Sequence, residues 1–275
     1  MIAVLNYLEV QNGITIIKNI NKKIVTNIFL DEVKISKLIQ EQNYFKIEFP
    51  EVLFFVNKRA AHYVLSYAAS SLESLKLALK NLNSNYKKEV FIADIIAKEE
   101  NPEIKQIFQQ VGFSNYTSLV RMSSMRNNDD MVFEKLENLK EANINQVSEI
   151  LALFHQYFDP KAEQIPNELE IKNWIVSGSL LIYEVENKIA GFIIFDLNGV
   201  TLYLRYWFVH PEYREQKIGS KLFQYFLYKG KNSKRQLFWV ITTNENAIKR
   251  YKHYGFKQEN MFNFVLINKK IKHEE

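Results

Sequence analysis

The chain has 275 residues, of which 47% are hydrophobic and 14% aromatic, and its net charge is +5. This size and apolar content predict two ordinary folded domains rather than disorder, and the small positive excess suits an anionic ligand without indicating nucleic acid. The sequence contains no cysteine, which excludes disulfides, thiolate zinc sites and a cysteine nucleophile, and we expect no metal.

The first half of the chain predicts short strands that give way to alternating strands and helices. We expect strands at residues 4–10, 14–17, 24–30, 44–49, 52–56, 62–67 and 89–97. Gly13 marks a turn between the first two of these strands. We expect helices around residues 33–39, 72–82 and 99–111, and the last of them ends at Gly112-Phe113.

The second half begins after a polar stretch, residues 123–130, which is the predicted linker. The predicted domains are therefore residues 1–125 and 131–275. A strand at 131–136 and helices at 142–157 and 168–176 come first. Strands at 180–185, 189–197 and 200–209 then form a meander, whose turns lie at Asn187-Lys188 and Asn198-Gly199.

An apolar strand, a short polar loop and an apolar helix follow one another at residues 200–227. The strand stops at Pro211, the loop carries Arg214, Gln216 and Lys217, and Gly219 opens the helix. Such a junction directs backbone N–H groups and the positive end of the helix dipole at one point. The sequence therefore predicts a phosphate or pyrophosphate site, which a residue without Cβ lets the backbone approach closely.

Three motifs in the second half resemble those of the GCN5-related N-acetyltransferases (GNAT). They are Val209-x-Pro211, Tyr213-Arg214-x-x-Lys217-x-Gly219 and Asn244-x-x-Ala247-x-x-x-Tyr251-x-x-x-Gly255-Phe256. The family's loop usually reads Arg/Gln-x-x-Gly-x-Gly/Ala, so Lys217 stands in place of the first glycine. The resemblance implies an α+β fold with a mostly antiparallel, mixed sheet flanked by helices.

The resemblance also implies an activity, the transfer of an acetyl group from acetyl-CoA to a primary amine by direct attack. The acceptor would be a small molecule or an amino acid, although a protein N-terminus or lysine is also compatible. Tyr251 would donate a proton to the departing thiolate. The residues implied in cofactor binding are Phe208, Val209, Arg214, Gln216, Lys217, Ile218, Gly219, Ser220 and Asn244.

The two halves resemble each other at an offset of 143 residues, at which Gly112-Phe113 falls on Gly255-Phe256. At this offset Asn101 falls on Asn244 and Phe108 on Tyr251. We therefore expect tandem GNAT-like domains, of which the first is degenerate and lacks the cofactor loop. An unrelated α+β domain that happens to end in Gly-Phe is the alternative.

Each implied role competes with a structural one. Tyr251 could be a core aromatic, as Phe108 would be; Asn244 could cap the helix that follows it; and Arg214 could be a solvated surface charge. Strand alternation predicts two faces for residues 202–208. It assigns Tyr203, Arg205 and Trp207 to one face, and Leu202, Leu204, Tyr206 and Phe208 to the other.

The general base is open among Glu184, Asp196, His210 and a water relay. Arg205 lies within an apolar strand and needs a partner. That partner could be a carboxylate on the acceptor, with Tyr203 and Glu184 as further substrate contacts, or an ion pair with Glu184 or a neighbour.

A second function class stays open, a catalytically silent CoA-binding or interaction module with the same fold. A nucleic-acid role would depend on the lysine-rich residues 229–235 and 269–272 and is disfavoured. No apolar run reaches the roughly 20 residues that span a bilayer, and Met1–Leu5 lacks a basic lead. We expect no membrane partner, a cytoplasmic location and either a monomer or a homodimer.

Overall fold

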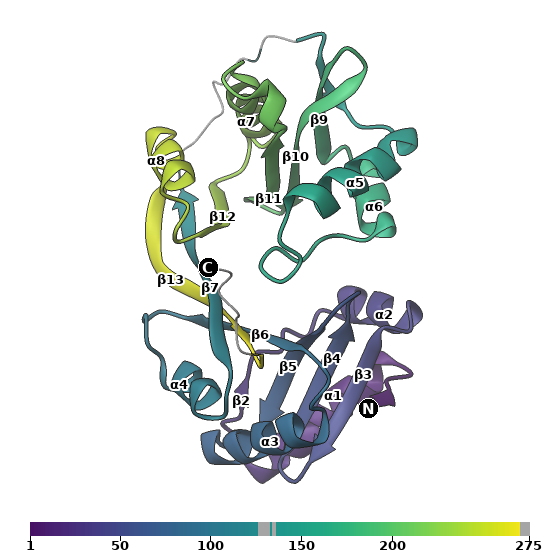
Figure 1. The fold of residues 1–275 in the computed structure, drawn as a ribbon, viewed down its shortest axis with the longest axis vertical. Coiled ribbons are helices and arrows are strands. Elements are labelled where there is room, and N and C mark those ends of the chain that lie inside the picture. Colours follow the sequence, from purple (N-terminus) through teal and green to yellow (C-terminus); the bar gives the residue numbers. More distant parts are fainter. Residues whose placement is uncertain (126–132, 134–135, 270–275) are drawn as a thin grey trace. The chain divides into compact units, whose positions relative to one another are not determined.

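The computed structural model describes residues 1–125, 133 and 136–269, which form two compact units. The first unit contains residues 1–120 together with the described residues from 260 onward, and the second contains residues 121–259 (Figure 1). The sequence predicted a division near the same point but assigned all of 131–275 to the second domain. Among the described residues, no helix is long and apolar enough to cross a membrane.

The first half of the chain has two helices among its first strands and two more helices among its later strands. Its elements are β1 (Ile2–Ala3), α1 (Tyr7–Ile20), β2 (Val25–Thr26), α2 (Glu32–Gln40), β3 (Tyr44–Phe49), β4 (Val52–Lys58), β5 (Tyr63–Ala69), α3 (Leu72–Asn85), β6 (Phe91–Ala97), α4 (Glu103–Gln110) and β7 (Ser114–Ser124).

The second half has a similar order, but it has no described strand between its first two helices and it carries two short 3₁₀ helices, η1 and η2. Its elements are β8 (Leu139–Glu141), η1 (Ile144–Gln146), α5 (Val147–Tyr157), α6 (Glu168–Val176), β9 (Leu180–Val185), β10 (Lys188–Asn198), β11 (Thr201–Val209), η2 (Pro211–Tyr213), α7 (Ile218–Lys229), β12 (Arg235–Ile241), α8 (Glu245–His253) and β13 (Lys257–Ile267).

Each unit is built on a mostly antiparallel sheet with helices beside it, as the fold class predicted (Figure 1). The strand order is β1-β3-β4-β5-β6-β13-β7 in the first unit and β7-β12-β11-β10-β9-β8 in the second. Among the neighbouring strands whose register is known, only two pairs run parallel, β5 with β6 and β11 with β12. The last strand of the chain therefore contributes to the first unit, where residues 262–267 pair with β6.

The two parallel pairs share an unusual feature, because each is joined at one end only. β11 and β12 pair from Thr201↔Arg235 to Tyr203↔Leu237, and β5 and β6 pair only at Tyr63↔Phe91 and Val64↔Ile92. Beyond these pairs the strands diverge. We name the divergence of β11 and β12 beyond Tyr203 and Leu237 the strand split.

The helices that follow the two splits end in the same way. Gly112 and Gly255 both have positive φ, +96° and +87°, a conformation that glycine adopts without strain. Phe113 N–H donates to the Phe108 carbonyl at 3.0 Å, and Phe256 N–H donates to the Tyr251 carbonyl at 3.1 Å. The matched element order and matched helix ends support the tandem arrangement predicted from the 143-residue offset.

The prediction was wrong for the start of the chain, where α1 replaces two predicted strands and the turn at Gly13. Asn6 caps this helix by accepting the Glu9 N–H, and Val10, Ile14 and Ile17 form its buried stripe. A Cβ on Gly13 would lie 2.3 Å from the Leu53 side chain. Gly13 therefore lets the helix lie close to β4 instead of marking a turn.

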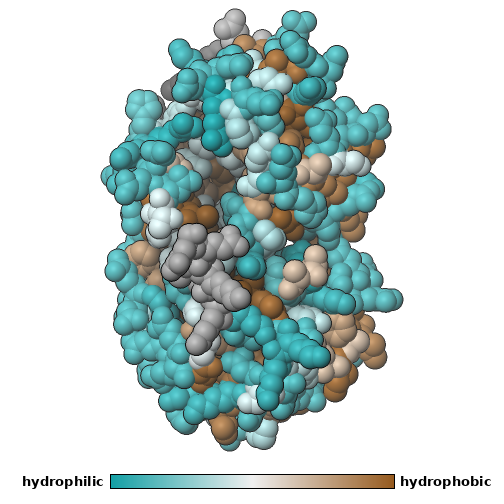
Figure 2. All heavy atoms as spheres, in the orientation of Figure 1, coloured by the Kyte–Doolittle hydropathy of each residue, from teal (hydrophilic) through white to brown (hydrophobic). Residues whose placement is uncertain are grey.

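Most other predicted elements agree with the structure within a few residues, although the predicted strand at 24–30 is only the two-residue β2. Gly199 has a φ of +57° in the predicted hairpin, and Asn198 pairs with Thr201. Most of the predicted strand at 131–136 and most of the predicted linker lie outside the described residues. On the face drawn in Figure 2, hydrophilic residues cover most of the surface of each unit, and the apolar residues form the cores.

Candidate functional site

The junction between β11 and α7 is an unusual loop with two left-handed residues that are not glycine. Glu215 has a φ of +74° and Lys217 a φ of +59°. Lys217 thus takes the conformation that favours glycine, at a cost of roughly 1–3 kcal/mol. Lys217 therefore has a left-handed backbone, which glycine adopts without strain, at the position where the family motif has glycine.

This loop presents a run of backbone N–H groups. Within the described part of the chain, no hydrogen bond is found for the N–H groups of residues 215–220. The last three of these residues form the first turn of the 12-residue helix α7. Orphan N–H groups and a helix dipole that meet at one point form an anion site. The side chains of Arg214, Gln216 and Lys217 are exposed around it.

Gly219 lies against β11 and is buried. A Cβ on Gly219 would lie 3.3 Å from both Trp207 and Val209 side-chain atoms, and its φ is not in the left-handed region. The sequence explained this glycine by close approach to a ligand. The structure adds a packing reason, since a Cβ here would require Trp207 and Val209 to give way by a few tenths of an ångström.

The predicted faces of β11 are wrong beyond Arg205 because a β-bulge interrupts the alternation. Ile194 pairs with Tyr206 and Phe195 with Leu204, so Arg205 is the extra residue. Beyond it, Trp207 joins the face of Leu202 and Leu204 that packs on α7.

Tyr206 and Phe208 lie instead on the face of Arg205, where α5 and α6 pack. The bulge lies where the strand split begins, so it exchanges the faces on which Tyr206, Trp207 and Phe208 lie.

Tyr251 lies in α8 with its ring packed beside the strand split. Its ring centroid is 4.0 Å from that of Phe238 on β12 and 5.5 Å from that of Trp207 on β11. Burial raises the pKa of Tyr251, and the positive charge of Arg250 opposes this only in part. The phenol is therefore protonated at neutral pH. In the described residues no hydrogen bond of its hydroxyl is found, so this group is available to a ligand.

Asn244 caps α8, as the structural alternative predicted. Its Oδ1 accepts the Ala247 N–H at 3.1 Å. For its side-chain amide nitrogen, no acceptor is found among the described residues, so the cap does not prevent a second role.

The cap predicts a measurable loss of stability. Asn244→Ala should lower the free energy of unfolding by about 1 kcal/mol, because the Ala247 N–H loses its acceptor. Asn244→Asp should stay near wild type, since aspartate caps equally well. Urea denaturation of the three proteins checks this, and equal stabilities of all three would contradict the capping role.

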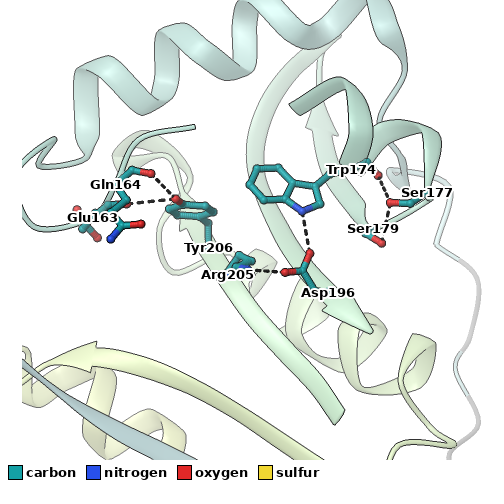
Figure 3. A network of polar contacts seen from close by, with 8 residues as sticks. All are labelled: Glu163, Gln164, Trp174, Ser177, Ser179, Asp196, Arg205 and Tyr206. Atoms are coloured by element: carbon teal, nitrogen blue, oxygen red, sulfur yellow. Dashed lines mark hydrogen bonds and ion pairs between the residues drawn. The ribbon is translucent and has the colours of Figure 1, made fainter. Parts of the chain in front are cut away.

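Arg205 has a partner within the protein. Its Nε donates to Asp196 Oδ2 at 2.5 Å, and its guanidinium lies 4.4 Å from the centroid of the Tyr203 ring. Asp196 also accepts the indole N–H of Trp174 at 2.9 Å (Figure 3). The Arg205 side chain is nevertheless 42% exposed, so this ion pair is open to a further carboxylate.

The candidates for a general base have different surroundings. Glu184 accepts from Gln146 and pairs with Lys140, two strands away from β11, so the structure does not bring it to Arg205 and Tyr203. Asp196 is held by Arg205 and Trp174. His210 lies 2.8 Å from the Tyr157 hydroxyl through Nε2, and its Nδ1 accepts the Glu212 N–H.

Sequence reasoning missed Glu163, a carboxylate in the loop between α5 and α6. The Tyr206 hydroxyl donates to the main-chain carbonyls of Glu163 and Gln164, at 3.1 and 2.7 Å, and ties this loop to the bulge (Figure 3). Burial raises the pKa of Glu163, while a hydrogen bond from the Asp159 N–H opposes the shift. Nothing in the sequence around Tyr206 indicated that its hydroxyl would contact the loop of Glu163.

At the equivalent junction in the first unit, a carboxylate of the protein itself, Glu51, lies beside the start of the helix. Ser71 caps α3 by accepting the Ser74 N–H. The Glu51 carboxylate accepts from the hydroxyls of Ser70 and Ser74, at 2.5 and 2.8 Å, and these bonds lower the pKa of Glu51. Phe108 has no hydroxyl where α8 has Tyr251. These features support the prediction that the first half lacks a cofactor loop.

Comparison with known proteins gives a family match for part of the chain and a shared fold. Residues 144–256 match the family model of the acetyltransferase (GNAT) family. No curated protein matches the sequence.

Solved structures share the fold at low identity. A GCN5-related N-acetyltransferase from Kribbella flavida has a TM-score of 0.56 and 10% identity, over 86% of this chain and 93% of its own. A tandem GNAT protein from the clavulanic acid biosynthesis pathway has a TM-score of 0.55 and 10% identity, over 80% of each chain. A conserved protein of unknown function from Enterococcus faecalis V583 has a TM-score of 0.58 and 8% identity, over 95% of this chain and 70% of its own.

Proposed function

Because residues 144–256 match the family model of the acetyltransferase (GNAT) family, we propose that the second unit transfers an acetyl group from acetyl-CoA to a primary amine. The observation that carries this proposal is the run of unpaired N–H groups at residues 215–220, which opens α7 beside the strand split. A diphosphate needs such donors, and an extended arm needs an unpaired strand edge. Both are present at one junction.

In this proposal the loop residues hold the diphosphate of CoA. Arg214, Gln216 and Lys217 supply exposed polar side chains, and Ile218, Gly219 and Ser220 supply N–H groups of the first helical turn. Phe208 and Val209 follow the bulge on the edge of β11 that has left β12. In the proposal, those of their backbone groups that do not face β10 line the path of the pantetheine arm, and the amide nitrogen of Asn244, at the start of α8, contacts the arm from the other side.

Bound acetyl-CoA supplies an acyl thioester, which a neutral amine attacks directly without an acyl-enzyme. Tyr251 donates a hydrogen bond from its protonated phenol toward the departing sulfur. A phenol whose pKa is raised holds its proton firmly, so we assign it stabilisation of the thiolate rather than complete proton transfer. Glu163 is the carboxylate that we assign to the amine proton, because the Tyr206 hydroxyl ties its loop to the bulge of β11 and burial raises its pKa.

The acceptor in this proposal is a small amine or an amino acid. Arg205 and Tyr203 form a half-exposed cation–π pair at the bulge. An amino-acid carboxylate could add to the Arg205–Asp196 pair there, because a guanidinium has five donors. Glu184 is not carried into the proposed acceptor site.

The first test is thermal unfolding with and without acetyl-CoA. Ligand at about 100 times its dissociation constant should stabilise the protein by roughly 2.7 kcal/mol, or a midpoint shift of roughly 5–10 °C. Lys217→Glu should weaken binding about tenfold, because it places a negative charge beside the diphosphate. Lys217→Gln, which only removes the charge, should have a smaller effect.

Lys80→Glu is the matched control, because Lys80 is exposed on α3 and undergoes the same change of charge. Its shift with acetyl-CoA should equal that of the wild type. Absence of a shift in the wild type would contradict the acyl-CoA proposal. A shift without turnover, in a screen that pairs each amino acid with its decarboxylated amine, would favour the catalytically silent binding module.

A further inference from the structure

The indole N–H of Trp207 is a buried hydrogen-bond donor that lacks an acceptor in the described part of the chain. In the described residues, no acceptor is found for its Nε1, which is inaccessible to solvent. Native proteins leave few buried polar groups without a partner, and each one calls for an explanation. The mechanism proposed above does not use this group.

Trp207 lies on β11 two residues beyond the bulge, where the ladder with β12 has already ended. Its ring stacks on Phe223 of α7, with centroids 4.8 Å apart and an angle of 28° between the planes. Tyr251 contacts it from α8, with centroids 5.5 Å apart. The indole therefore borders the strand split and touches the residue proposed to act on the thioester.

The same indole nitrogen faces the first turn of α7. A Cβ on Gly219 would lie 3.6 Å from Nε1. The loop of residues 215–220 and the strand split therefore both lie next to this donor. A ligand that runs from the loop into the split comes close to this N–H and reaches it once the side chains that cover the indole shift.

A phenylalanine would fill most of the same space without the unpaired donor. The groups that lie against the indole include the rings of Phe223 and Tyr251, and the guanidinium of Arg250 lies 5.8 Å from its ring centroid. Since an unsatisfied buried donor destabilises a protein, tryptophan is a poor choice here for packing alone. The indole N–H is explained if a ligand supplies its acceptor.

We propose that the Trp207 indole N–H donates a hydrogen bond to an amide oxygen of the pantetheine arm, which makes Trp207 a positioning residue for the acyl donor. The inference rests on the proposed function, since it takes CoA as the ligand. Pantetheine carries two amide carbonyls, whereas the loop residues already supply donors for the diphosphate. The bond would fix how far the arm extends along β11, and with it the position of the thioester beside Tyr251.

Trp207→Phe is the test, because it keeps an aromatic ring and removes the donor. The dissociation constant for CoA, measured by calorimetry, should rise about 3- to 10-fold, which is the worth of one net hydrogen bond. The unfolding midpoint without ligand should stay the same or rise, because the unsatisfied donor is gone. A residue with only a packing role would show a lower midpoint instead.

Trp174→Phe is the control of opposite sign. The Trp174 indole N–H already has an acceptor, Asp196. Its loss should lower the midpoint without ligand and leave the CoA affinity unchanged. The two variants make the same substitution, so the crossed result separates the effect of an unpaired donor from the effect of ring size.

ADP serves as the second ligand, because it has the diphosphate but lacks the arm. Trp207→Phe should weaken CoA and leave ADP unaffected. Equal weakening of both would overturn the assignment to pantetheine and favour a phosphate oxygen. Wild-type affinity of Trp207→Phe for CoA would overturn the inference alone, while failure of the wild type to bind CoA would overturn the proposed function and the inference with it.

A measurement on the wild-type protein covers the case in which the variant does not fold. The chain has three tryptophans, so their indole N–H signals are few in a nitrogen-correlated NMR spectrum. One indole signal should move downfield when CoA is added and should exchange more slowly with water. No change in any of the three signals on CoA binding would contradict the hydrogen bond.

Discussion

Replacing Tyr251 by phenylalanine is expected to lower kcat about 100-fold, the usual effect of removing one donor that acts in the transition state. The ring would keep its contacts with Phe238 and Trp207. Among the described residues the hydroxyl has no hydrogen bond to lose, so the unfolding midpoint and the CoA affinity should change little. Steady-state kinetics with the best acceptor of the screen would measure the effect, which should fall on kcat rather than KM.

Tyr254→Phe is the matched control, because Tyr254 directly follows the same helix and packs on Phe223. Its kcat should equal that of the wild type. Burial raises the pKa of Tyr251 above the ordinary value of about 10. Ionisation of this phenol should therefore not lower the rate at any pH below about 10. A wild-type kcat for Tyr251→Phe would remove the tyrosine from the mechanism.

The sequence was a good guide wherever local chemistry decides the structure. The apolar strands from Leu180 to Val209, the hairpin at Gly199 and the glycine that ends α8 were all predicted. The run of N–H groups that opens α7 was expected for the same reason, because a strand, a polar loop and a helix that follow one another bring such groups together. That residues 215–220 bind an anion stays a prediction.

Contacts between distant residues were not predictable from local patterns. Gly13 suggested a turn because a glycine weakens a helix, and the compensating contact with Leu53 lies 40 residues away. The bulge at Arg205 is set by the register of β10, so no property of β11 alone revealed that Trp207 and Arg205 lie on opposite faces. The pairing of β13 with β6 joins residues more than 160 positions apart.

Gly191→Ala should show how closely α7, β10 and β11 are packed at the proposed cofactor site. A Cβ on Gly191 would lie 2.7 Å from the Phe208 carbonyl oxygen and 3.3 Å from Ile218. The first of these is a backbone atom, which cannot rotate away as a side chain can. The methyl group must therefore displace the end of β11, with a loss of about 1–3 kcal/mol in the free energy of unfolding.

The displacement should also reduce binding, because Phe208 and Ile218 belong to the proposed cofactor site. Gly199→Ala is the control in the same hairpin, at its other end. No atom lies within 4 Å of its added Cβ, but its φ of +57° should cost about 1 kcal/mol. It should retain the full acetyl-CoA shift, whereas Gly191→Ala should lose most of it. Equal shifts for the two variants would mean that the end of β11 does not contact the cofactor.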